Sequence, residues 1–177
     1  MATLLSSLGI IGFPAPGAAF EFKPHNVENT HFDFMLPLQS PGPVYFEVKY
    51  TEAGFGVAKP DSEHLWKFYN VYKPRLADRF EKSFCCYSLF LKNYQIMRNV
   101  WHLDRDKDDI VVFLFPKSNE ELRRKEVIIN SCALEPFRSR IKIIYIEDLV
   151  TALGRELRRT NAGKEAFLVE FCRKYFP

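Results

Sequence analysis

Three short apolar segments between residues 19 and 50 alternate with polar positions and are separated by Pro, Asn and Gly. Their sequences are AFEFK, THFDFMLPL and PVYFEVKY, and their richness in Phe, Val and Tyr is typical of β-strands. Because the connections are short, the pattern predicts a three-stranded meander. The preceding residues 1–19 carry repeated Gly and Pro, which predicts at most a short helix followed by a loop.

Beyond Gly56 the spacing of apolar residues lengthens to a helical period. A helix is predicted there, beginning after the capping sequence Asp61-Ser62-Glu63 and ending at Pro74. A second, longer helix is predicted over about Ser88 to His102, because its apolar residues form one broad face.

Two nearly unbroken apolar runs, DIVVFLFP and IKIIYI, predict strands that are buried on both faces. The sequence Ser118-Asn119-Glu120-Glu121 predicts the start of a helix between them, and EDLVTALGRELRR predicts a helix after the second. The order is a meander, helices, strand, helix, strand and helix. It predicts an α/β fold, a three-layer sandwich with a mixed central sheet.

The composition supports one folded domain over residues 1–177. A chain of 177 residues has the usual length of one domain, and 47% hydrophobic residues can form a substantial core. The net charge of +3 permits a polyanionic partner but does not identify one.

Cysteine spacing and the N-terminal sequence bear on location. The four cysteines include no pair with the two-residue separation of zinc ribbons, so we expect reduced, mostly buried thiols in a reducing cytosol. The N-terminal segment is apolar but lacks the positive region of a signal peptide, and its apolar run is too short to span a bilayer. These features predict a cytoplasmic protein without a membrane partner.

The second and third segments of the meander bring polar residues together. Taking Pro41 as the centre of the turn sets Asp33 opposite Lys49, with Glu47 one diagonal step away on the same face. That face also carries His31, Met35 and Tyr45. The other face is apolar and holds Phe32, Phe34, Leu36, Val44, Phe46 and Val48.

Two neighbouring carboxylates repel each other unless they share a proton or a cation. Asp33 and Glu47 suit a hard divalent cation such as Mg²⁺, which prefers oxygen ligands and retains water molecules. Lys49 could then orient a nucleophilic water or stabilise charge on a phosphoryl group. The alternative from spacing alone is an ordinary cross-strand ion pair on an exposed sheet face.

Asp33, thirteen intervening residues and then Glu47-Val48-Lys49 resemble the active-site signature of the PD-(D/E)XK nuclease superfamily. More narrowly, VYFEVKYTEAGFG, FLKNYQIMRNVWHL and VVFLFPKSNEEL are similar to segments of bacterial restriction-endonuclease-like proteins. The likeness spans about residues 30–150. It implies a restriction-endonuclease-like core and a nuclease activity, with DNA as the expected substrate and endonucleolytic cleavage as the expected mode.

The resemblance also implies roles for individual residues. Asp33 and Glu47 would be metal ligands, with the backbone carbonyl of Val48 as a third, and Lys49 would be the catalytic lysine. Gln95 would offer its polar side chain to a metal-bound water or to the substrate phosphate. The implied cofactor is Mg²⁺, for which Mn²⁺ can substitute.

One departure from the superfamily concerns the acid that often precedes the first core strand on a helix. The available acids here are Glu21 and Glu28, and neither has a helical setting in the sequence. Among the basic residues, Lys59, Lys67 and Lys73 flank the proposed site in sequence and are weak candidates for phosphate contacts.

Three hypotheses therefore stand at the level of sequence. The first is a Mg²⁺-dependent nuclease that uses Asp33, Glu47 and Lys49. The second is a catalytically inactive module on the same fold that binds nucleic acid or protein. The third is a structural α/β domain that binds protein, for example as a homodimer formed through its surface aromatic residues.

Overall fold

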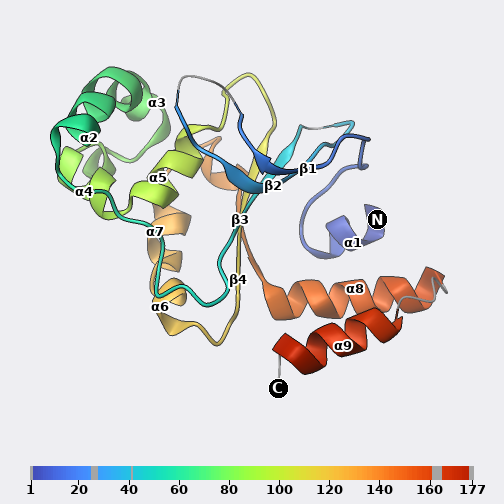
Figure 1. Ribbon diagram of the computed structural model, residues 1–177. Helices are drawn as coiled ribbons and strands as arrows, with labels where there is room; N and C mark the ends of the chain where they lie inside the picture. The colour runs from blue at the N-terminus through green and yellow to red at the C-terminus, as the bar shows by residue number, and fades with distance from the viewer. Residues whose placement is uncertain (1, 25–27, 41, 161–164, 176–177) are drawn as a thin grey trace.

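The computed structural model describes residues 2–24, 28–40, 42–160 and 165–175 and has a five-stranded sheet with helices on both sides (Figure 1). The strands are β1 (Ala19–Phe22), β2 (Phe32–Leu36), β3 (Val44–Val48), β4 (Ile110–Phe115) and β5 (Ile141–Tyr145). The α-helices are α1 (Ala2–Ser7), α2 (Ser62–Lys67), α3 (Leu76–Arg79), α4 (Tyr87–Lys92), α5 (Tyr94–Trp101), α6 (Glu120–Arg123), α7 (Glu126–Ser131), α8 (Ile146–Thr160) and α9 (Glu165–Tyr175). A π-helical turn, η1 (Phe68–Tyr72), and three 3₁₀ turns, η2 (Lys73–Arg75), η3 (Lys82–Phe84) and η4 (Arg138–Arg140), complete the elements.

The sheet is mixed, as the sequence predicts. Its strand order is β1-β2-β3-β4-β5, with the first three strands antiparallel and β3, β4 and β5 parallel. Every residue of β4 is buried, because β4 lies inside the sheet and both of its faces are covered. The fold class is therefore α/β, and the meander and the buried strand β4 are confirmed. The prediction that the second apolar run is also buried on both faces is wrong, because β5 lies at the edge of the described sheet and only Ile141 and Ile144 are buried in it.

Apolar side chains form a separate core on each face of the sheet. The larger core joins Val111 and Phe113 of β4 to apolar residues of η1 and of helices α3 to α7. The smaller core joins Val112 and Leu114 to residues of α1 and α8. Figure 1 shows α2 to α7 on one side of the strands and α1, α8 and α9 on the other. Alternate residues of β4 thus anchor two helical sides.

The register between β2 and β3 differs from the prediction by two residues. Phe34 pairs with Phe46, so continuing the ladder sets Asp33 level with Glu47 and not with Lys49. The prediction took Pro41 as the turn centre, and Pro41 lies outside the described residues. A shift of two residues keeps each side chain on its own face, so the pairing changes while the polar face is retained.

Phe32 is an exception to the predicted alternation. It stacks on Tyr45 in the larger core, whereas Phe34 contacts Phe46 on the opposite face. Between the paired residues of β1 and β2, Glu21 has a positive φ of 49°. Phe20 and Phe22, on either side of Glu21, likewise pack on opposite faces, against Phe34 and Tyr45 respectively, so the regular alternation is interrupted on both paired strands at this level.

The predicted helix over Ser88 to His102 is divided into α4 and α5 at Asn93. In a continuous helix the amide of Gln95 would donate to the carbonyl of Leu91. Instead, Gln95 donates to Gly56 O at 3.0 Å, and Leu91 O accepts from Ala58 N at 3.0 Å. The segment 56–58 therefore provides the hydrogen-bond partners that Gln95 N and Leu91 O would have found in each other, and the helix is interrupted there.

Both predicted helix starts are confirmed. The side chain of Asp61 accepts from His64 N at 2.9 Å at the start of α2, and Asn119 accepts from Leu122 N at 3.2 Å at the start of α6. The predicted end at Pro74 is wrong, because helical backbone continues through η2 into α3. Proline is tolerated in the first turn of η2, where its missing N–H is not required.

The cysteines are free, as expected, but they are less buried than predicted. Cys132 is buried, Cys85 and Cys172 are half-buried, and Cys86 is exposed. Among the described residues, none of the helices has the length and apolar character needed to cross a membrane.

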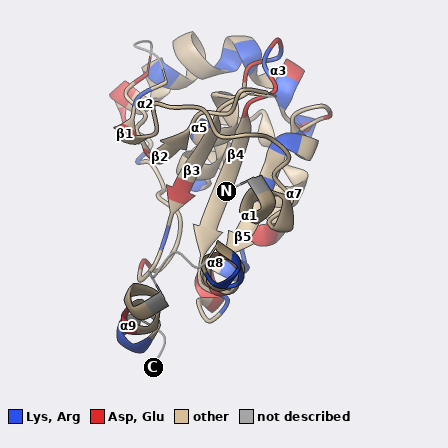
Figure 2. Ribbon diagram, turned by 90° about the vertical axis from the view of Figure 1, so that its right-hand side faces the viewer, with Lys and Arg blue, Asp and Glu red and all other residues tan. Residues whose placement is uncertain are grey.

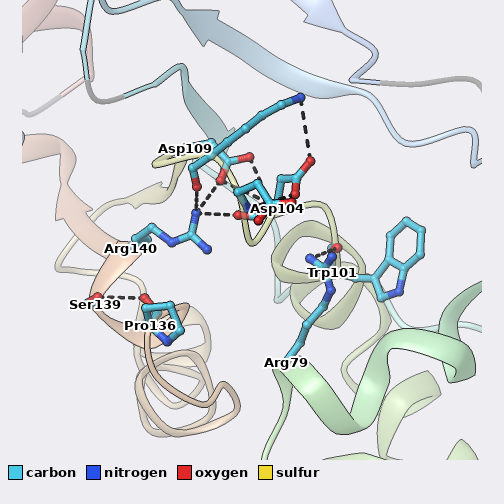
Figure 3. Close-up of polar contacts among 9 residues, drawn as sticks. Arg79, Trp101, Asp104, Asp109, Pro136, Ser139 and Arg140 are labelled. Carbon is cyan, nitrogen blue, oxygen red and sulfur yellow. Dashed lines mark hydrogen bonds and ion pairs between the residues drawn. The ribbon is translucent and has the colours of Figure 1, made fainter.

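A buried polar network lies where β4 begins, and Figure 3 shows its members. Arg140 Nη1 donates to Asp109 Oδ1 at 2.8 Å and to the carbonyl of Asp104 at 2.8 Å. Both carboxylate oxygens of Asp109 also accept from Asp104 N at 3.2 Å. Burial raises the pKa of Asp109 to about 6, although the Asp104 amide and Arg140 oppose this shift.

The raised pKa of Asp109 predicts a pH-dependent stability. Since folding favours the protonated carboxyl, its stabilising contribution is complete below about pH 4 and is lost as pH rises through about 6. As pH rises from 4 to 7, the wild type should therefore lose about 2–3 kcal/mol in free energy of unfolding that the uncharged variant Asp109→Asn keeps. Urea denaturation at intermediate pH values measures this difference. A difference that stays constant with pH would contradict the assignment.

Candidate active site

The carboxyl end of β3 carries Glu47 and Lys49 beneath helix α5. Glu47 is 2% exposed, so it is not part of a solvated ion pair on the sheet surface. Its Oε1 accepts from Gln95 Nε2 at 2.5 Å, and its Oε2 accepts from Asn99 Nδ2 at 2.8 Å. Lys49 Nζ lies 2.9 Å from Oε1. Three donors therefore compensate a buried carboxylate.

The protonation of Glu47 reflects competition between burial and these donors. Burial raises its pKa most strongly, the hydrogen bond and charge of Lys49 lower it, and the charge of Asp33 raises it. The net pKa is above the ordinary value of a glutamate. The register of β2 on β3 sets Asp33 level with Glu47, which accounts for this repulsion between the two carboxylates.

Asp33 is held at the same strand end by the backbone. Its Oδ2 accepts from Val48 N at 2.6 Å. The pairing of β2 with β3 ends at Phe34 and Phe46, so the next amide of β3 that faces β2 bonds to a side chain. The arrangement fixes the Asp33 carboxylate beside the Val48 peptide, in agreement with their predicted proximity.

Lys49 lies between two carboxylates. Its Nζ is 2.9 Å from Glu47 Oε1 and 3.7 Å from Glu52 Oε1, and its side chain is 13% exposed. Burial alone would lower its pKa, but the hydrogen bond to Glu47 and the charges of Glu47, Glu52 and Asp33 raise it. Lys49 is therefore a protonated cation at neutral pH.

Gln95 connects the loop after β3 to the site. Its Oε1 accepts from Gly56 N at 2.8 Å while its Nε2 donates to Glu47. Gln95 thus lies in the site, as the resemblance implies.

The sequence reasoning missed Asn99 and Glu52. Asn99 follows Gln95 by four residues, a spacing that would have placed it on the same helical face. Its Oδ1 is buried and has no hydrogen-bond partner among the described residues. Glu52 follows Lys49 by three residues, but no regular element there would have predicted their contact.

The donors present fit a hard cation. Carboxylate oxygens of Asp33 and Glu47 and the orphan amide oxygen of Asn99 are the ligand types that Mg²⁺ accepts. No group of three or more His, Cys, Asp or Glu residues able to hold a metal occurs in the described part of the chain. A cation here would therefore depend on two carboxylates together with amide, backbone or water oxygens.

Glu28 forms a separate buried cluster on the loop before β2. It accepts from Thr30 Oγ1, and it lies 3.5 Å from His102 Nε2 and 3.9 Å from Arg98 Nη1. Burial would raise its pKa, but hydrogen bonds from His102 and Thr30 and the charge of Arg98 outweigh burial and lower the pKa to about 2. Glu28 thus bonds to the C-terminal end of α5, and its contacts within the described part of the chain are separate from those of Glu47.

The remaining predicted residues lie away from the carboxylate pair. Lys59 and Lys73 are exposed, and Lys67 pairs with Glu63 at 2.9 Å. Among the described residues, none of these lysines forms a hydrogen bond or ion pair with Asp33 or Glu47. His31 and Glu21 are exposed as well. The structure thus brings together Asp33, Glu47, Val48, Lys49 and Gln95 and leaves the three lysines outside this cluster.

Two carboxylates and a lysine thus lie at the end of adjoining strands of an α/β sheet, in a chain whose sequence matches a restriction-endonuclease-like family. The family model described as "Restriction Endonuclease associating with ARP" matches residues 5–176, and the chain belongs to this family. No curated protein and no solved structure matches the chain.

Removing the ammonium from the site should destabilise the fold. Lys49→Met leaves Glu47 buried without its cation, which we expect to lower the free energy of unfolding by roughly 3 kcal/mol at pH 8. The loss should shrink at pH 5, because Glu47 can then bind a proton. Denaturant unfolding of both proteins at the two pH values measures it.

The double variant Lys49→Met with Glu47→Gln provides the control, since it removes both charges while keeping the shape of the acid. We expect it to recover part of the lost stability. A double variant less stable than Lys49→Met at pH 8 would contradict the proposed charge compensation.

Proposed function

We propose that the chain is a metal-dependent nuclease that hydrolyses phosphodiester bonds in DNA. The observation that carries the proposal is the meeting of Asp33, Glu47 and Lys49 in a member of a restriction-endonuclease family. We also propose that the sheet and its two helical sides correspond to a three-layer sandwich with a restriction-endonuclease-like core. Endonucleolytic cleavage and a bacterial, cytoplasmic setting remain predictions.

Asp33, Glu47 and the carbonyl of Val48 would hold Mg²⁺, or Mn²⁺ in its place. A bound cation supplies a more acidic water and compensates charge on the phosphoryl oxygens. The unpartnered Oδ1 of Asn99 is a further oxygen able to orient a water at this site.

Lys49 and Gln95, which both donate to Glu47 Oε1, are the groups able to move from this carboxylate to a substrate or a water. Both oxygens of Glu47 accept hydrogen bonds, so a cation must replace at least one donor. Lys49 is the donor with a second carboxylate, Glu52, nearby. Once displaced from Glu47, its ammonium can contact a phosphoryl oxygen or orient the attacking water, and Gln95 can donate to the same water or phosphate.

Cleavage of DNA by freshly purified protein tests the proposal. We expect Mg²⁺- or Mn²⁺-dependent nicking of a supercoiled plasmid, and roughly a 10²- to 10³-fold slower rate for Glu47→Gln, Asp33→Asn or Lys49→Ala. Lys117→Ala serves as a matched lysine control, because Lys117 forms an exposed ion pair with Asp148. The control should cleave at the wild-type rate.

The alternative is a catalytically inactive module on this fold that binds nucleic acid or protein. The saturated hydrogen bonding of Glu47 and the position of Glu28 outside any helix favour this alternative. The family description names an association with ARP, and we propose the same association for this chain. Folded wild type that leaves plasmid, linear duplex and single-stranded DNA intact under both metals would favour the module.

Metal binding should also be visible without activity. A ligand that binds only the folded state adds about 1.4 kcal/mol per tenfold increase in its concentration above Kd. We expect the melting temperature of the wild type to rise with Mn²⁺ concentration and that of Asp33→Asn to stay nearly constant. Calorimetry across a Mn²⁺ series measures both. An equal rise in the melting temperatures of the two proteins would show that Asp33 is not a metal ligand.

A further inference from the structure

Helix α2 and the π turn η1 expose aromatic side chains that the site described above does not use. Trp66 is 62% exposed and Tyr69 is 50% exposed. A spacing of three residues makes them neighbours on one side of the helical segment. Rings of this size are usually more buried in a folded protein, so their joint exposure indicates a binding surface.

The exposed rings are fixed by buried neighbours. Phe68 and Tyr72 of the same π turn are buried, and both contact the ring of Phe90. The ring of Tyr69 packs edge-to-face on Phe68, and Asn70 Nδ2 donates to Trp66 O at 2.8 Å. The wider π turn thus anchors one side in the core while it presents Trp66 and Tyr69 on a rigid support.

The charge around these rings is basic. Residues 59–75 carry four basic residues, Lys59, Lys67, Lys73 and Arg75, against two acidic residues, Asp61 and Glu63. Lys73 Nζ lies 4.5 Å from the centre of the Tyr69 ring. Figure 2 shows Lys and Arg in blue along the helices around α2 and α3, with Asp and Glu in red between them, and Lys67 pairs with Glu63 at 2.9 Å. Interleaved lysines and aromatic rings match the phosphates and bases of a nucleic-acid strand.

The aromatic surface formed by Trp66 and Tyr69 lies on an element that begins beside the candidate active site. The ring of His64 in α2 packs edge-to-face on Tyr94, the residue before Gln95. The segment leading into α2 bonds to both α4 and α5 through Ala58 and Gly56. Figure 1 places α2 in the same helical side as α4 and α5. A strand that lies along α2 would therefore pass close to the helix that covers Glu47.

We propose that α2 and η1 bind single-stranded nucleic acid, with bases stacked on Trp66 and Tyr69 and phosphates contacted by Lys59, Lys67 and Lys73. The proposal rests on the proposed nuclease function and narrows its substrate to single strands or frayed ends. Ring faces can stack only on bases that are unstacked, and an intact duplex does not offer them. A protein partner fits less well, because lysine is depleted at the centre of protein interfaces.

Binding measured in EDTA tests the surface without cleavage. Fluorescence anisotropy with a labelled single-stranded oligonucleotide should give tighter binding than its blunt duplex. Trp66→Ala and Tyr69→Ala should each weaken single-strand binding roughly five- to hundredfold. Phe167→Ala is the matched control, because Phe167 is 71% exposed on α9, and this variant should bind like the wild type. Circular dichroism confirms that each variant folds.

Tryptophan fluorescence provides a second readout. The chain has two tryptophans, and Trp101 is only 3% exposed, so stacking of bases should quench the emission of Trp66. Trp66→Phe should lose this quenching while it keeps most of the affinity. Lys67→Ala and Lys73→Ala should each flatten the dependence of log K on log salt by about 0.7.

The outcomes separate this inference from the proposed function. Equal affinity for single strand and duplex, or no effect of Trp66→Ala and Tyr69→Ala, overturns the inference even if the protein cleaves DNA. If single-stranded DNA binds and quenches the emission of Trp66, but the protein cleaves no DNA, the inference is supported and the nuclease proposal is contradicted.

Discussion

The buried carboxylate of Glu47 is the constraint on which the site depends. A carboxylate beneath a helix is tolerated only with donors on its oxygens, and Gln95, Asn99 and Lys49 supply them. These contacts fix how α5 lies on the sheet. They also compensate the buried charge of Glu47.

The break at Asn93 links this constraint to the surrounding elements. The segment Gly56–Ala58 bonds to the backbone of α4 and α5 and also donates to the side chain of Gln95. One short segment therefore interrupts the helix, orients a residue of the site and leads directly into α2. The candidate active site and the aromatic surface are parts of one continuous arrangement.

The two sides of the sheet differ in chemistry. The side covered by α2 to α7 contains Glu47, the Glu28 cluster and a core rich in aromatic rings. The side covered by α1, α8 and α9 is lined by aliphatic and aromatic residues, including a cavity of about 320 Å³ between α1, α8 and the strands. The proposed catalytic site and the proposed nucleic-acid-binding surface both lie on the first side.

The sequence alone determined the α/β class, the strands β4 and β5, the burial of β4, and the caps at Asp61 and Asn119. These features follow from local periodicity and from side chains that bond to nearby backbone. Tertiary structure decided the register of β2 on β3, the direction of Phe32, the break at Asn93 and the contacts of Asn99 and Glu52. Each of these features depends on contacts between segments that are distant in the sequence, and a local sequence pattern does not predict such contacts.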